Sequence, residues 1–315
     1  MAKRRGAFLA ALLIAWIALG AAGVIFARSR GIAISAGAPV IAAFLIETPF
    51  YLVAGFPDIR MRLAGPRLPV HLLASAVLPY LVCCCGGIPF RWAGLGAMFA
   101  MALALSVWYR VLPAHPLTDL GYLTFAGAII VSGVLAFVYP AFHKQHLDIL
   151  GHISVVEIAL LVMMLERGVP ETGFGFLPSW MEWRVGALHF LYFLAIAFPV
   201  NLALKATHLV DPRPVWQVAA AFLGSLWFQA LSEEFFFRGL LQQWIESWIG
   251  RRTVALLLTS AIFGLIHYRW RGWKWVVLVA VLGWACGRAR NQSNGIRAGT
   301  VTHALVIATW RAFFA

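Results

Sequence analysis

Long apolar runs without a charge are the feature that most constrains how this chain can fold. Ala7–Ala27 is one such run, and Pro214–Leu231 is another. A run of about 20 apolar residues matches the hydrocarbon thickness of a bilayer when it is helical. Inside a bilayer every backbone polar group needs a partner in the protein, and a helix supplies one within each segment. We therefore expect an all-α, polytopic transmembrane helix bundle with about 8–11 spans.

The composition supports a membrane protein and argues against a nucleic-acid-binding one. Of the 315 residues, 62% are hydrophobic and 12% are charged, whereas soluble proteins have about 45–50% and about 25%. The net charge of +13 comes with arginines in short loops, where they set orientation and contact anionic headgroups. We expect membrane lipids as partners and no nucleic acid. A composition rich in Ala, Arg and Trp suggests a multi-pass protein of the bacterial inner (cytoplasmic) membrane.

The longest polar connection, residues 166–184, divides the chain into two parts. It contains five charged residues and a Gly-Phe-Gly-Phe stretch, which is typical of a flexible interfacial loop. Residues 1–165 carry no recognisable motif, and we expect them to form an N-terminal transmembrane accessory bundle. Residues 185–315 carry the polar motifs and are expected to form the functional core.

Two adjacent glutamates, Glu233 and Glu234, follow the uncharged run Pro214–Leu231. A carboxylate is costly in hydrocarbon, so chains keep one mainly where it faces a packed interior or a wet cavity. Glu234 and Arg238 are four residues apart and can form an ion pair on one helix face. Glu233 then points about 100° away and stays available. The alternative is a purely structural ion-pair network. In that case the single pair with Glu234 satisfies Arg238, and Glu233 has no cationic partner.

Two histidines follow on the next apolar segments. His267 ends the pattern Phe263-x-x-x-His267, and His303 lies in the last segment. Carboxylates and imidazoles on three apolar helices can converge only in the interior of the bundle. This combination supports hydrolysis, in which a carboxylate takes a proton from water and imidazoles orient the water or donate to an oxyanion. The alternatives are an interfacial His267 at a helix end and a core His303 bonded to a backbone carbonyl.

Other polar residues in apolar runs are expected to be structural, although they could form a polar path or a second site. They are Glu47, His152, Glu157 and His189. The four cysteines have neither the spacing of a disulfide framework nor that of a zinc site, since Cys83, Cys84 and Cys85 are consecutive and Cys286 is isolated.

The three motifs in order resemble the signature of the CAAX protease and bacteriocin-processing family (CPBP, or Abi), which includes the type II CAAX prenyl endopeptidase. The motifs are Glu-Glu-x-x-x-Arg from Glu233, Phe-x-x-x-His from Phe263, and the last-helix His303. The resemblance covers roughly residues 185–315 and implies an intramembrane endopeptidase. No HExxH zinc motif, intramembrane Asp pair or rhomboid-type serine motif competes with it.

The resemblance implies a role for each matching residue. Glu233 matches the base that activates water, His267 the histidine that assists it, and His303 the histidine that stabilises the oxyanion. Glu234 and Arg238 match the supporting ion pair, and Phe263 is expected to pack around the site.

Family members are described both as metal-dependent and as metal-free glutamate proteases, and we favour the metal-free version, without a cofactor. Zinc stays possible, and Glu233, His267 and His303 would then be its ligands.

One position departs from the family pattern. An Asn or Asp usually lies four residues after the last-helix histidine, whereas this chain has Ile307. A lost oxyanion donor typically costs about 2.7–4 kcal/mol of transition-state stabilisation. Thr300 or Asn294 could replace it.

The sequence therefore predicts an intramembrane glutamate-type endopeptidase that cuts near the membrane boundary. Its substrates would be peptides or membrane proteins: leader peptides, bacteriocin-type peptides or C-terminal sorting signals. The alternative, supported by Ile307, is a catalytically impaired membrane scaffold or regulator. A proton-coupled transporter is disfavoured because no inverted repeat is present.

Overall fold

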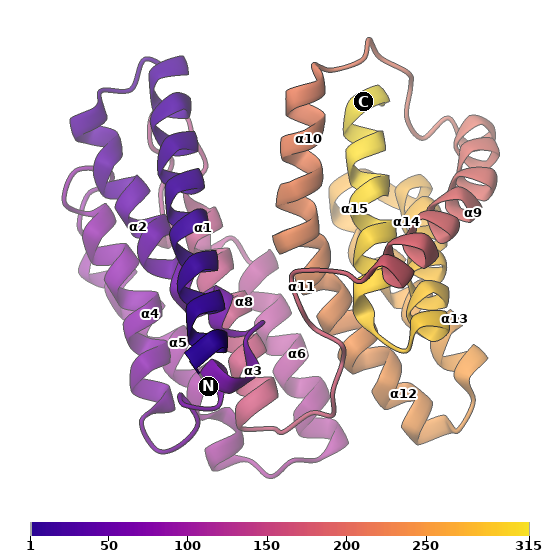
Figure 1. The fold of residues 1–315 in the computed structure, drawn as a ribbon, viewed down its shortest axis with the longest axis horizontal. Helices are drawn as coiled ribbons and strands as arrows, with labels where there is room; N and C mark the ends of the chain where they lie inside the picture. Colours follow the sequence, from indigo (N-terminus) through magenta and orange to yellow (C-terminus); the bar gives the residue numbers. More distant parts are fainter. Residues whose placement is uncertain (1, 315) are drawn as a thin grey trace. The chain divides into compact units, whose positions relative to one another are not determined.

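The computed structural model describes residues 2–314, without the side chains of residues 2–4, 270 and 271. The described residues form helices and no named strand, apart from two isolated bridges, Phe142–Gln145 and Leu209–Phe314. The predicted all-α bundle is confirmed. The helices form two compact units, which meet in sequence between Pro170 and Glu171 (Figure 1).

In the described part of the chain, six helices are long and apolar enough to cross a membrane, which supports an integral, multi-pass membrane protein. They are Arg5–Ser29, Ile34–Val53, Trp92–Val111, Asp148–Leu165, Trp180–Leu204 and Val215–Ile249. Shorter apolar helices cover Leu68–Cys83, Pro116–Val131 and Arg252–Ile266. The exact number of spans stays a prediction.

The first unit is built around α8. Every residue from Ser154 to Met163 in this helix is buried, as expected for a helix that is apolar on all sides. It packs against α2, α4, α5, α6 and α7 (Figure 1). The helices of this unit are α1 (Ala2–Ser29), α2 (Ile34–Val53), α3 (Pro57–Arg60), α4 (Leu68–Cys83), α5 (Trp92–Val111), α6 (Pro116–Val131), α7 (Val134–Val138) and α8 (Asp148–Leu165).

Two buried carboxylates lie inside this first unit. The Ser154 hydroxyl donates a hydrogen bond to Glu47, and Glu157 lies three residues further along the same face of α8. Neither carboxylate oxygen of Glu157 has a hydrogen-bond partner among the described residues. The other two polar residues singled out in the sequence, His152 and His189, bond to the backbone carbonyl of the preceding turn, as structural histidines do.

The second unit surrounds its last helix, α15. Helix α15 packs against α9, α10 and α14, and α13 packs against α14 (Figure 1). Its helical segments are α9 (Trp180–Leu204), α10 (Val215–Gly224), η1 (Ser225–Gln229), α11 (Ala230–Glu234), η2 (Phe235–Leu241), α12 (Gln242–Ile249), α13 (Arg252–Ile266), α14 (Tyr268–Ser293) and α15 (Ile296–Phe313). Helix α14 is kinked at Gly272, whose φ of 70° favours glycine.

The glutamate pair lies in a helix that alternates between two geometries. The single α-helical turn α11 is flanked by π-helical segments, η1 before it and η2 after it. A π-helix bonds i to i+5 and is rare, and its short segments within α-helices occur frequently at functional sites. The wider turns change which side chains share a face, so they help to aim the glutamates into the unit.

Candidate active site

A fully buried ion pair joins Glu234 to Arg238. Arg238 Nη1 lies 3.2 Å from Glu234 Oε1, and both side chains are inaccessible to solvent. Arg238 Nη2 donates a hydrogen bond to the Gly283 carbonyl at 3.0 Å, and the guanidinium lies over the Phe263 ring, 4.3 Å from its centroid. Arg238 therefore ties η2 to both α13 and α14, and Phe263 contributes a cation–π contact in a desolvated place.

The Phe263 ring lies between the charged groups. It makes edge contacts with His267 at 5.0 Å and with His303 at 5.7 Å between ring centroids. Phe263 is completely buried. Its packing contact with both histidines fixes the angle of each imidazole ring.

His303 is bracketed by the two glutamates. Its Nδ1 lies 2.9 Å from Glu234 Oε1, and its Nε2 lies 3.8 Å from Glu233 Oε2. Because Arg238 compensates the charge of Glu234, this carboxylate can accept the Nδ1 hydrogen. The alternative of a core histidine bonded to a backbone carbonyl does not describe His303, whose partners are carboxylates. Glu233 and Glu234 diverge along the helix, but they reach opposite nitrogens of the same ring.

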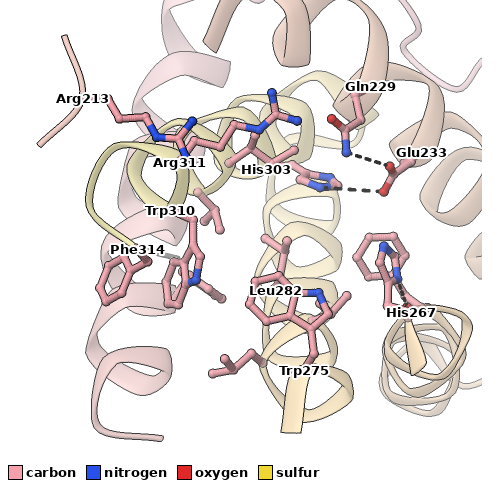
Figure 2. Close-up of a pocket in the computed structure, with 16 residues that line it drawn as sticks. Arg213, Gln229, Glu233, His267, Trp275, Leu282, His303, Trp310, Arg311 and Phe314 are labelled. Carbon is pink, nitrogen blue, oxygen red and sulfur yellow. Dashed lines mark hydrogen bonds and ion pairs between the residues drawn. The ribbon is translucent and has the colours of Figure 1, made fainter. Parts of the chain in front are cut away.

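The two glutamates differ in their access to a pocket. The Glu233 side chain is 26% exposed, whereas that of Glu234 is fully buried. Glu233 lines a pocket of about 580 Å³ together with His267 and His303 (Figure 2). Glu233 is therefore accessible to a reactant in the pocket, whereas Glu234 contacts Nδ1 of His303 in the buried interior.

His267 is the C-cap of α13, which ends at Ile266, and it also lines this pocket. Its Nδ1 lies 2.8 Å from the Phe263 carbonyl oxygen. A carbonyl oxygen can only accept, so Nδ1 carries the hydrogen, and in the neutral ring Nε2 is the acceptor. The helix-end position expected for an interfacial histidine is therefore compatible with a place in the site.

Two residues that sequence reasoning missed also shape the site. Gln229 Nε2 donates to Glu233 Oε1 at 3.4 Å and lines the same pocket (Figure 2). Its position four residues before Glu233 was the available signal. Gly299 lets α15 approach Glu234, since a Cβ there would lie 3.0 Å from Glu234 Oε2.

Residues 214–309 match a family model described as type II CAAX prenyl endopeptidase Rce1-like. The match covers 96 of the 315 residues of the chain. The matched region contains all three motifs, and the match supports a CAAX-type intramembrane protease at the level of the family. Searches of curated proteins and of solved structures find no match to the chain.

The candidate site offers one close set of side chains of the types that bind metals in the described part of the chain. Ligand atoms of Glu234, Cys286 and His303 lie within 4.8 Å of one another. The Arg238 guanidinium already lies 3.2 Å from Glu234 Oε1, and the same oxygen faces His303 Nδ1. Glu234 Oε1 is therefore shared by Arg238 and His303, whereas Glu234 Oε2 has no hydrogen-bond partner among the described residues. His267 is not a member of this set.

Ile307, the residue that departs from the family pattern, lies at the candidate site. Ile307 lines the pocket, so no hydrogen-bond donor stands where the CAAX protease pattern has Asn or Asp. Thr300 is buried and its hydroxyl donates to the Ile296 carbonyl, while Asn294 ends α14; neither lines the pocket. Gln229 has an amide side chain and does line the pocket.

Proposed function

We propose that this protein is an intramembrane glutamate-type endopeptidase that hydrolyses a peptide bond near the membrane boundary. The observation that carries the proposal is the placement of Glu233 Oε2, 3.8 Å from His303 Nε2, at the wall of the pocket. Leader peptides, bacteriocin-type peptides and C-terminal sorting signals are the proposed substrates. The proposed location is the bacterial inner membrane.

In the proposed reaction, Glu233 acts as the general base. A water molecule beside Glu233 gives it a proton while the water oxygen attacks the carbonyl carbon of the scissile bond. His267 accepts a hydrogen bond at Nε2 from the second O–H of this water, which keeps its proton, because Nδ1–H donates to the Phe263 carbonyl. The attack forms a tetrahedral intermediate whose oxygen carries a negative charge.

His303 and Gln229 would stabilise that charge. In the doubly protonated His303 ring, Glu234 accepts from Nδ1 and Nε2–H donates to the oxyanion, as in other carboxylate–imidazole pairs. The intermediate then collapses with cleavage of the C–N bond, and Glu233 returns its proton to the departing amine. Water is consumed, and a carboxylic acid and an amine are produced.

Cleavage by the purified protein in liposomes tests the function. The substrates are a pool of membrane-protein tails and leader peptides, and mass spectrometry identifies the products. We expect wild-type protein to create new termini, His267→Ala to slow the reaction by about 100-fold, and a chelator to leave the rate unchanged. Loss of activity with the chelator, restored by zinc, would contradict the metal-free mechanism.

Gln229 is predicted to donate in place of the missing Asn. Replacing it with Leu should lower kcat by about 100-fold with little change in KM, because the hydrogen bond forms mainly in the transition state. The double variant Gln229→Leu/Ile307→Asn is expected to recover part of the rate, since Asn restores a donor across the pocket. An unchanged kcat for Gln229→Leu would remove the amide from the mechanism.

Ile307 favours a second candidate, a scaffold or regulator that keeps the fold without cleaving. This candidate predicts no new termini from wild-type protein and full function in cells for Glu233→Gln. The protease predicts the opposite on both counts.

A further inference from the structure

Two arginines line the same pocket as the catalytic candidates. Arg213 and Arg311 are both exposed at its wall, and Figure 2 shows them on the other side of His303 from His267. Neither residue lies in the three sequence motifs. Arg213 lies in the connection before α10, and Arg311 lies in the last turn of α15.

Backbone pairing holds the two arginines together. The amide of Arg213 donates to the Ala312 carbonyl at 3.1 Å, and the amide of Val210 donates to Phe313 at 2.9 Å. The isolated bridge between Leu209 and Phe314 extends the same contact. The two guanidiniums therefore start from neighbouring backbone positions, although like charges repel.

Neither guanidinium forms an ion pair with a described carboxylate, including Asp211, which precedes Arg213 by two residues. No salt bridge or side-chain hydrogen bond joins either guanidinium to a described residue. The only carboxylate among the lining residues is Glu233, which is engaged with Gln229 and His303. The wall around Arg213 and Arg311 therefore presents two guanidiniums without an ion-pair partner among the described residues.

We propose that Arg213 and Arg311 bind a carboxylate of the peptide substrate. This inference rests on the proposed function, because it names the class of peptide that the same pocket takes. A pair of guanidiniums offers up to ten N–H donors and matches a planar carboxylate in charge and geometry. The bound carboxylate belongs either to the C-terminus of the peptide or to an acidic side chain near the scissile bond.

The rest of the pocket sets the remaining requirements on the peptide. Its walls beside the arginines are aromatic, with Phe193, Trp275, Trp310 and Phe314 among the lining residues. An apolar peptide with an acidic end satisfies both surfaces. A sorting-signal tail that ends in arginines would be repelled, so this inference narrows the proposed substrates to acidic ones.

Peptide binding tests the inference without requiring cleavage. The probes are a fluorescent alanine–leucine peptide with a free C-terminal carboxylate, its C-terminal amide, and an amide carrying one aspartate near the end. Their Kd values are measured by anisotropy with the full chain carrying Glu233→Gln, in nanodiscs of neutral phosphatidylcholine. A carboxylate-bearing probe is expected to bind about tenfold more tightly than the plain amide.

Three variants locate the effect. Arg213→Gln and Arg311→Gln should each reduce the preference, and the double variant should abolish it. Arg251→Gln is the matched control, because Arg251 is exposed in the same unit, does not line the pocket and loses the same charge. Tighter binding of the free acid identifies the C-terminus as the source of the carboxylate. Tighter binding of the aspartate probe identifies an acidic side chain. Equal Kd values for all three probes would overturn the inference.

Lipid phosphate is the competing ligand. The nanodisc measurement is repeated with anionic phosphatidylglycerol, and bound lipid is counted by native mass spectrometry. Loss of bound phosphatidylglycerol in the double variant, with the peptide preference unchanged, would reassign the arginines to lipid and overturn the inference. Protein with Glu233 intact is also tested for cleavage. If it cleaves no peptide but still prefers the carboxylate probes, the proposed protease function is overturned and the binding site is kept.

Discussion

Replacing Glu233 with Gln is expected to lower the rate of peptide hydrolysis by about 100- to 10,000-fold, the range measured for loss of a general base. The amide keeps the shape of the side chain and cannot accept the proton of the attacking water. Because Glu233 is 26% exposed and is not part of the buried ion pair, the temperature of thermal unfolding should stay nearly unchanged. Cleavage is measured with purified protein in liposomes, and unfolding by circular dichroism in detergent.

Glu171→Gln is the matched control for this substitution. Glu171 is an exposed glutamate in the same unit and does not line the pocket. This variant should cleave at the wild-type rate. A Glu233→Gln protein that remains folded and cleaves as fast as the control would exclude Glu233 as the base.

Replacing Arg238 with Met is expected to destabilise the protein by about 3–5 kcal/mol, because it leaves the Glu234 charge buried without a partner. The substitution also removes the hydrogen bond to Gly283 and the contact with the Phe263 ring. Chemical or thermal unfolding in detergent measures the loss.

The double variant Glu234→Gln/Arg238→Met separates stability from catalysis. It removes the orphaned charge, so it should recover part of the stability lost in Arg238→Met. Hydrolysis should stay low, because His303 no longer has a carboxylate at Nδ1. The single variant Glu234→Gln completes the comparison. If the loss of stability in the double variant equals the sum of the losses in the two single variants, the ion pair does not couple Glu234 to Arg238.

Much of this architecture follows from the sequence, for identifiable physical reasons. Uncharged runs predict helices because a bilayer leaves the backbone no other partner, and the four-residue spacing of Glu234 and Arg238 predicts their ion pair. Their burial together with His303 and Phe263 follows from the cost of charge in hydrocarbon.

Other features depend on contacts that spacing alone does not encode. The π-helical segments η1 and η2 lie in a run that reads as one regular helix, so ideal α-helical angles do not describe where its side chains point. Both glutamates reach His303 because α15 packs closely at Gly299. Arg213 joins the pocket only because its connection pairs with the end of α15, more than ninety residues further along the chain.

The site also gives the departure at Ile307 a physical meaning. An apolar side chain occupies the pocket wall where a donor is expected, and the amide of Gln229 enters from η1. The two arginines lie on the other side of His303 from His267, so the proposed carboxylate contact would place the charged end of a peptide away from His267 (Figure 2). Together these features support the proposed protease and an apolar peptide substrate that carries a carboxylate.

The most direct test of the central claim is to map peptide termini in membranes from cells that produce wild-type protein, Glu233→Gln or Glu171→Gln at equal levels. The proposed function predicts a set of new termini, near membrane boundaries, that is present with wild-type and Glu171→Gln protein and absent with Glu233→Gln. Identical termini in all three membranes, with all three proteins folded, would contradict it.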